Sequence, residues 1–149
     1  MKSLFDLPEN QKMIDRINRL TPQAEAQWGT MNVAQMLAHA GTPIMVALGD
    51  LKLKKGLAGI VFGRIVRRMI VNEKPFKRNS PTDKRFIIAD ERQFDTEKGR
   101  LIDLVQRFAH SGPNGLTKEP HPFFGKLSPT EWDLLMWKHL DHHLQQFGV

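Results

Sequence analysis

The stretch SPTEWDLLMWKHLDHHLQQ, residues 128–146, carries the clearest helix signal in the chain. Ser128 is a suitable N-cap, Pro129 suits the first helical position, and Glu131 follows Ser128 by three residues, which completes a capping box. Gly148 lies just beyond the expected end of the segment. These signals predict a helix that begins after Ser128 and ends at about Gln146.

Placed on a helical wheel of about 100° per residue, this segment shows which side chains face the core. The large apolar residues cluster within about 80° of Trp132, namely Leu135, Met136, Leu140 and Phe147. His139 and His143 fall about 20° to either side of Trp132, so both imidazoles are predicted to point into the core. The wheel places His142 at the edge of the apolar face and turns Lys138, Asp141 and Gln145 towards solvent.

Outward from this segment, four more helical patterns are present. The first covers residues 8–20, and the second is capped by Thr30 or Asn32 and ends near Leu48. The third covers residues 55–71, and the fourth runs from Phe94 or Asp95 to about His110. Residues 86–88 are apolar but too few to assign a structure. No convincing strand is found. The sequence therefore predicts one all-α domain over residues 1–149, a four-helix bundle with an additional short helix and long connections.

Two core histidines four residues apart lie one turn apart on a helix face, and this spacing lets both reach one metal ion. A buried neutral imidazole needs a partner for each ring nitrogen, and a metal with a second hydrogen-bond acceptor supplies both. The alternative is that backbone carbonyls alone bond to His139 and His143.

His39 is the candidate third ligand, at the border of the apolar face of the second predicted helix. Pro43 removes the hydrogen bond to the His39 carbonyl, so a bend there can tip His39 inward. A surface histidine is the alternative. His121, in a proline-rich loop, either closes one end of the bundle or forms a turn, and His110, at a helix end, is assigned no chemistry.

The composition excludes several chemistries. The chain has no cysteine, so disulfides, cysteine-ligated metals and a thiol nucleophile of its own are excluded. Between Lys52 and Arg85, eleven basic residues oppose only Glu73 and Asp83. Such a segment attracts nucleic acid, anionic lipid or an acidic ligand, or is a solvated connection. No apolar run approaches the roughly 20 residues of a membrane helix, and residues 1–10 lack a secretory signal, so a cytoplasmic protein is expected.

Three blocks carry a family resemblance: residues 28–39, 119–127 and 131–148. Through them the chain resembles the DinB-like superfamily of metal-binding four-helix bundles, and most closely a branch catalogued as domain of unknown function 1569. The resemblance implies that His39, His139 and His143 bind a metal. It also implies that His121 neighbours the site without being an assigned ligand.

Two function classes remain open from the sequence. Some DinB-like proteins are S-transferases or isomerases that use small thiols such as bacillithiol or mycothiol, which implies a metal-dependent enzyme here. An all-imidazole ligand set favours zinc or nickel. No general base or catalytic residue is identified, so a non-catalytic metal- or small-ligand-binding bundle is the alternative. The expected partner is a small molecule. Neither a membrane nor nucleic acid is expected, since no nucleic-acid-binding motif is present, and a homodimer is left open.

Overall fold

The computed structural model describes residues 2–54, 67, 74–80 and 82–149. Its long helices are α1 (Leu7–Arg19), α2 (Val33–Leu48), α4 (Phe94–Ser111) and α5 (Pro129–Gln146), and two short 3₁₀ helices are η1 (Lys84–Phe86) and η2 (Pro113–Gly115). The described residues contain no strand, only an isolated bridge between His121 and Gly125. The all-α fold with four long helices is thus confirmed, while the helix predicted over 55–71 lies, apart from Arg67, outside the described residues.

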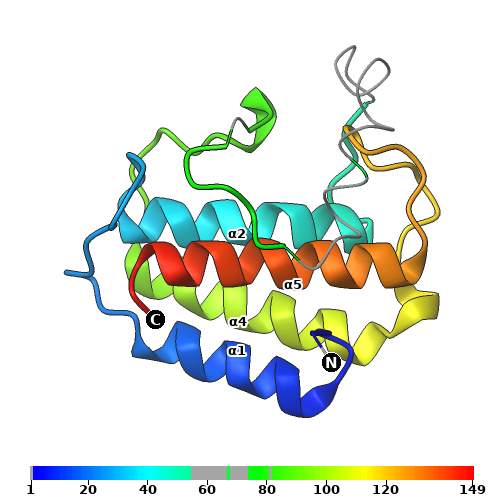
Figure 1. The fold of residues 1–149 in the computed structure, drawn as a ribbon, viewed down its shortest axis with the longest axis horizontal. Helices are drawn as coiled ribbons and strands as arrows, with labels where there is room; N and C mark the ends of the chain where they lie inside the picture. The colour runs from blue at the N-terminus through cyan, green and yellow to red at the C-terminus, as the bar shows by residue number, and fades with distance from the viewer. Residues whose placement is uncertain (1, 55–66, 68–73, 81) are drawn as a thin grey trace.

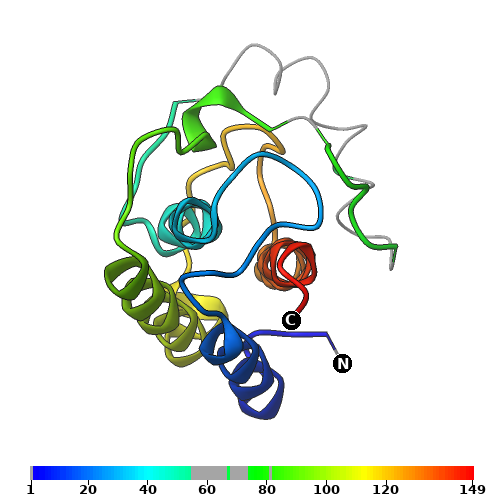
Figure 2. The same cartoon turned by 90° about the vertical axis from the view of Figure 1, so that its left-hand side faces the viewer.

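The four helices form a ring in which α2 packs against α4 and α5, and α1 packs against the same two helices. Figure 2 shows this ring nearly end-on. In Figure 1, α2 and α4 run in the same direction, while α1 and α5 run opposite to them. Parallel neighbours cannot be joined by a tight turn, so the chain between α2 and α4 must return along the length of the bundle. This is the physical reason for the long connection predicted there.

Local capping fixes where the helices begin. Ser128 and Glu131 form the predicted capping box at the start of α5. For α2 the sequence left Thr30 and Asn32 as alternatives, and the structure selects Asn32, whose side chain accepts a hydrogen bond from the Gln35 N–H. The α2 helix ends at Gly49, whose φ of 81° is in the left-handed region that glycine adopts without strain.

The core lies between the four helices and is built largely from the predicted apolar faces. Its fully buried side chains include Trp132, Met136 and Leu140 of α5. The segment before α1 is held to α5 by Asp133, whose carboxylate accepts hydrogen bonds from Ser3 Oγ (2.5 Å) and the Leu4 N–H (2.6 Å). No helix among the described residues is both long enough and apolar enough to cross a membrane.

The helical wheel turned Lys138 and Asp141 towards solvent, and the structure differs at both. The Asp141 side chain is 14% exposed and pairs with Arg16 of α1 at 2.7 Å. Lys138 was expected to face solvent, yet only 5% of its surface is exposed. Its ammonium lies 4.9 Å from the centre of the Phe76 ring, so the segment 74–80 covers this side of α5. A wheel of α5 alone cannot include a segment that is distant in the sequence.

Candidate metal centre

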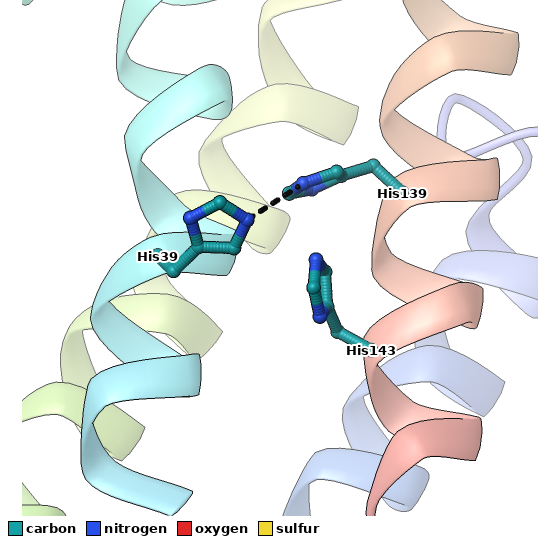
Figure 3. A group of neighbouring side chains, drawn as sticks. All are labelled: His39, His139 and His143. Carbon is teal, nitrogen blue, oxygen red and sulfur yellow. Dashed lines mark hydrogen bonds between the residues drawn. The ribbon is translucent and has the colours of Figure 1, made fainter. Parts of the chain in front are cut away.

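Three histidines meet where α2 packs against α5. One ring nitrogen from each of His39, His139 and His143 lies within 4.8 Å of the other two. Figure 3 shows His139 and His143 projecting from α5 towards His39 on α2. The Nε2 atoms of His139 and His39 are 3.2 Å apart. His39 is 4% exposed, so the alternative that made it a surface histidine is wrong.

The Phe86 carbonyl fixes the protonation of His39. His39 Nδ1 lies 2.7 Å from the Phe86 carbonyl oxygen, at the end of η1, which packs against α2. Because a carbonyl oxygen can only accept a hydrogen bond, Nδ1 must carry the hydrogen of the neutral ring. The lone pair is therefore on Nε2, the nitrogen that faces His139.

Gln146 has the same effect on His143. Its side-chain NH₂ donates a hydrogen bond to the Trp28 carbonyl at 2.6 Å, so its Oε1 is the atom that lies 2.8 Å from His143 Nδ1. An amide oxygen also only accepts, so His143 carries its hydrogen on Nδ1 and a lone pair on Nε2. Two of the three rings are thus held in the tautomer that ligates through Nε2.

Glycine is required next to this amide. A Cβ atom added at Gly29 would lie 2.6 Å from Gln146 Nε2, and the backbone there has a φ of 82°. A side chain at position 29 would therefore push Gln146 away from Trp28. Sequence reasoning missed the roles of Gln146 and Phe86. Gly29 was the available signal, since glycine is favoured where the backbone adopts a left-handed conformation or approaches another group closely.

The three imidazoles are held neutral. Burial lowers the pKa of His39 even though the Phe86 carbonyl opposes the shift. Burial also lowers the pKa of His143 to about 3, and His39 contributes to that shift. The pKa of His139 lies well below its ordinary value because of burial and then of its two histidine neighbours. Neutral rings have free lone pairs near pH 7, which metal ligation requires.

His121 supports the turn before α5 and lies outside the cluster of three histidines. Its Nδ1 accepts hydrogen bonds from the N–H groups of Phe123 (3.0 Å) and Phe124 (3.1 Å), which matches the turn-forming alternative. It is 4% exposed, and its ring lies 5.2 Å from that of Trp132. Burial lowers the pKa of His121 to about 4, so this ring is also neutral.

The remaining histidines lie elsewhere. His110 is exposed and its Nδ1 bonds to the carbonyl of Gln106 at 2.8 Å, one turn back along α4. His142 is half-buried beside the cluster, with its ring 5.7 Å from that of Trp28 and 5.1 Å from that of His143.

Two arginines of the basic segment 52–85 pair with acidic residues of their own chain. Arg67 forms two 2.7 Å hydrogen bonds to the Glu131 carboxylate, and Arg85 pairs with Asp83. Much of the segment lies outside the described residues.

A family model described as "Protein of unknown function (DUF1569)" matches residues 2–148. No curated protein and no solved structure matches the chain.

Proposed function

The chain belongs to the DUF1569 family of proteins of unknown function, and for this member we propose a metal-binding function centred on His39, His139 and His143. The observation that carries the proposal is the fixed tautomers of two of these rings. Phe86 and Gln146 accept the Nδ1 hydrogens of His39 and His143, which leaves their Nε2 lone pairs for a common ligand.

The donor set fits a transition metal. Without a metal, a hydrogen bond gives partners to two of the three ring nitrogens, because His139 Nε2 can donate to His39 Nε2 at 3.2 Å. That single bond cannot also serve His143, whose ring centre lies 4.6 Å from that of His139. A cation bound by all three nitrogens accounts for the convergence. Imidazole ligands favour zinc or nickel over magnesium or calcium.

We further propose that the bundle is DinB-like and acts as a metal-dependent transferase for a small-molecule thiol, or as a related enzyme. When bound, zinc or nickel supplies a Lewis acid with an open coordination position that lowers the pKa of a thiol or water. The chain has no cysteine, so a sulfur nucleophile must come from the substrate. Its own residues orient the ligands through Phe86 and Gln146 and keep them neutral by burial.

A non-catalytic metal-binding bundle is the second candidate. Among the described residues, the candidate ligand group holds three histidines and no carboxylate. With all three engaged as ligands, none of them is free to act as a general base. This observation favours a protein that binds its metal, or a ligand on it, without turnover.

Metal analysis of untagged protein, purified without added metal, tests the binding proposal. We expect about one equivalent of metal in the wild type and in His110→Ala, which changes an exposed histidine, and a large loss in His139→Ala. Equal metal content in the two variants would reject the proposed ligands.

A transfer assay separates the two candidates. Bacillithiol, mycothiol or glutathione is supplied with an electrophilic acceptor to metal-loaded and to chelated protein. Turnover that requires metal and disappears in His143→Ala supports the enzyme. Turnover that persists in a metal-free His143→Ala variant contradicts it, and full metal occupancy without turnover supports the binding protein.

A further inference from the structure

The loop before α5 holds a buried histidine that the proposed metal site does not use. His121 is 4% exposed, and its Nδ1 accepts hydrogen bonds from the N–H groups of Phe123 and Phe124. Its backbone exchanges two more hydrogen bonds with Gly125, whose φ of 75° is in the left-handed region that glycine adopts without strain. These contacts within one short loop fix the position and the orientation of the His121 ring.

The same contacts decide which nitrogen of His121 carries a hydrogen. A backbone N–H can only donate, so Nδ1 keeps its lone pair and the hydrogen of the neutral ring is on Nε2. His39 and His143 are held in the opposite tautomer, with their lone pairs on Nε2. His121 therefore presents a hydrogen-bond donor where the candidate ligands present lone pairs.

The Nε2–H of His121 has no acceptor among the described residues, since the hydrogen bonds of its ring all end on Nδ1. The Phe86 ring is nearly parallel to the imidazole, at 23°, so an N–H in the imidazole plane does not point at its face. The Asp83 carboxylate is close enough to raise the pKa of His121, yet both of its oxygens bond to Arg85. Because a buried donor without an acceptor is costly, this N–H favours an acceptor from outside the chain.

His121 lies beside the candidate metal centre, towards the start of α5. Its ring is 5.2 Å from that of Trp132, which precedes His139 by seven residues on the same face of α5, or about 10 Å along the helix axis. The His121 ring also stacks on Phe86, whose carbonyl orients His39. His121 contributes to the lowered pKa of His139, so the charges of these two rings interact.

Both this donor and the candidate ligands are open to a small molecule. Of the three candidate ligands, His139 is the one that is only partly buried, so the cluster is reached from its side. The unpartnered polar atoms that are fully enclosed in the described part of the chain do not include His121 Nε2; they belong to Arg92, Glu97, Trp132 and Trp137.

We propose that His121 determines specificity at the candidate metal centre. Its Nε2–H donates a hydrogen bond to a carboxylate or amide oxygen at the far end of a thiol whose sulfur takes the open metal position. This inference rests on the proposed metal-dependent function, and it narrows the substrate class to extended thiols with an acceptor oxygen roughly 10 Å from the sulfur.

Binding of simple thiols to the cobalt-loaded full chain tests the proposal, because a thiolate on cobalt(II) gives a charge-transfer absorption. The probes are mercaptohexanoate and mercaptohexanamide, which end in a carboxylate and an amide, and hexanethiol, which has no acceptor oxygen. We expect His121→Asn to weaken binding of at least one of the first two about tenfold, and that of hexanethiol by less than about twofold. The oxygen-bearing thiol that loses more affinity tells carboxylate from amide.

The variant is chosen to keep the loop. An asparagine oxygen can accept the N–H groups of Phe123 and Phe124 as Nδ1 does, whereas the donor at the Nε2 position is lost. His110→Asn, at an exposed histidine of α4, is the matched control and should leave all three affinities unchanged.

The outcomes distinguish this proposal from that of the metal site. A chain that binds no cobalt would overturn both. With cobalt bound, three results would overturn the role of His121 alone: no thiol binding, equal weakening of all three thiols by His121→Asn, or no weakening at all. Long-range ¹H–¹⁵N spectra of the metal-free protein give a check without metal or activity. They should show His121 with its hydrogen on Nε2, and a hydrogen on Nδ1 would contradict the proposal.

Discussion

The Gln146 side chain joins His143 to the loop before α2: its oxygen lies 2.8 Å from His143 Nδ1, and its nitrogen donates to the Trp28 carbonyl. The amide can satisfy both bonds in only one orientation, so the backbone of Trp28 decides which nitrogen of His143 carries a hydrogen. Gln146, which is not itself a candidate ligand, thus determines that the free lone pair of His143 is on Nε2.

Replacing Gln146 should therefore weaken metal binding while all three ligands remain. We expect Gln146→Leu to lower zinc affinity by about 10- to 100-fold, the usual effect of removing a partner that orients a ligand. Competition with a chromophoric chelator measures it. Gln145→Leu is the control, because the Gln145 amide bonds to Asp141 on the exposed side of α5. Equal affinities of the two variants would show that Gln146 does not orient His143.

Gly29→Ala should act on the same contact from the other side. The new Cβ would lie 2.6 Å from Gln146 Nε2 at a backbone position with φ of 82°, so we expect a loss of about 1–3 kcal/mol in unfolding free energy together with weaker zinc binding. Urea unfolding measures the stability. Gly99→Ala, within α4, is the control. Its new Cβ would meet nothing within 4 Å, and alanine is more favourable than glycine in a helix by about 1 kcal/mol. A Gly29→Ala protein as stable as the wild type would disprove the close contact.

Chelation should lower the melting temperature without unfolding the bundle. The core between the four helices contains large fully buried side chains such as Trp132 and Phe108, so its folding free energy does not depend on the metal as that of a zinc finger does. Metal that binds only the folded state adds stability by mass action. Circular dichroism at 25 °C should keep its helical signal after chelation, and loss of that signal would contradict the prediction.

Acid should destabilise the metal-free protein before its carboxyl groups titrate. The pKa of His121 is about 4 in the folded chain against 6.5 for the free side chain. Above pH 6.5 the ring is neutral in both states and has no effect. As the pH falls below 6.5, the unfolded chain gains a proton that the folded chain cannot take, so stability falls, by about 2 kcal/mol from His121 alone at pH 5.

Urea unfolding of metal-free protein at pH 7 and pH 5 measures this loss. His121→Asn keeps an acceptor oxygen near the Nδ1 position but does not titrate. Between pH 7 and pH 5 its unfolding free energy should therefore fall by about 2 kcal/mol less than that of the wild type. His110→Asn, at an exposed site, should behave as the wild type does. Identical pH dependence in all three proteins would exclude His121 as the source.

The sequence alone determined α5 and the direction of two of its histidines. The capping box at Ser128 and the spacing of His139 and His143 around Trp132 are local properties of one helix, and helix geometry is the same in any fold. Helices α1, α2 and α4 followed from equally local signals, with ends displaced by a residue or two. The helix predicted over 55–71 stays a prediction, since apart from Arg67 it lies outside the described residues. His39 was a candidate from its position at the border of an apolar face, which is compatible with either surface or core, and the family resemblance favoured it as a ligand.

Only the tertiary structure decided what these side chains meet. The Phe86 carbonyl, the Gln146 amide with Trp28, and the cover of Lys138 by Phe76 each join elements that are far apart in the sequence. Helical periodicity gives the direction of a side chain about its own axis. It does not give the neighbouring helix or loop in that direction, because this depends on how the four helices pack and on the path of the long connection between α2 and α4.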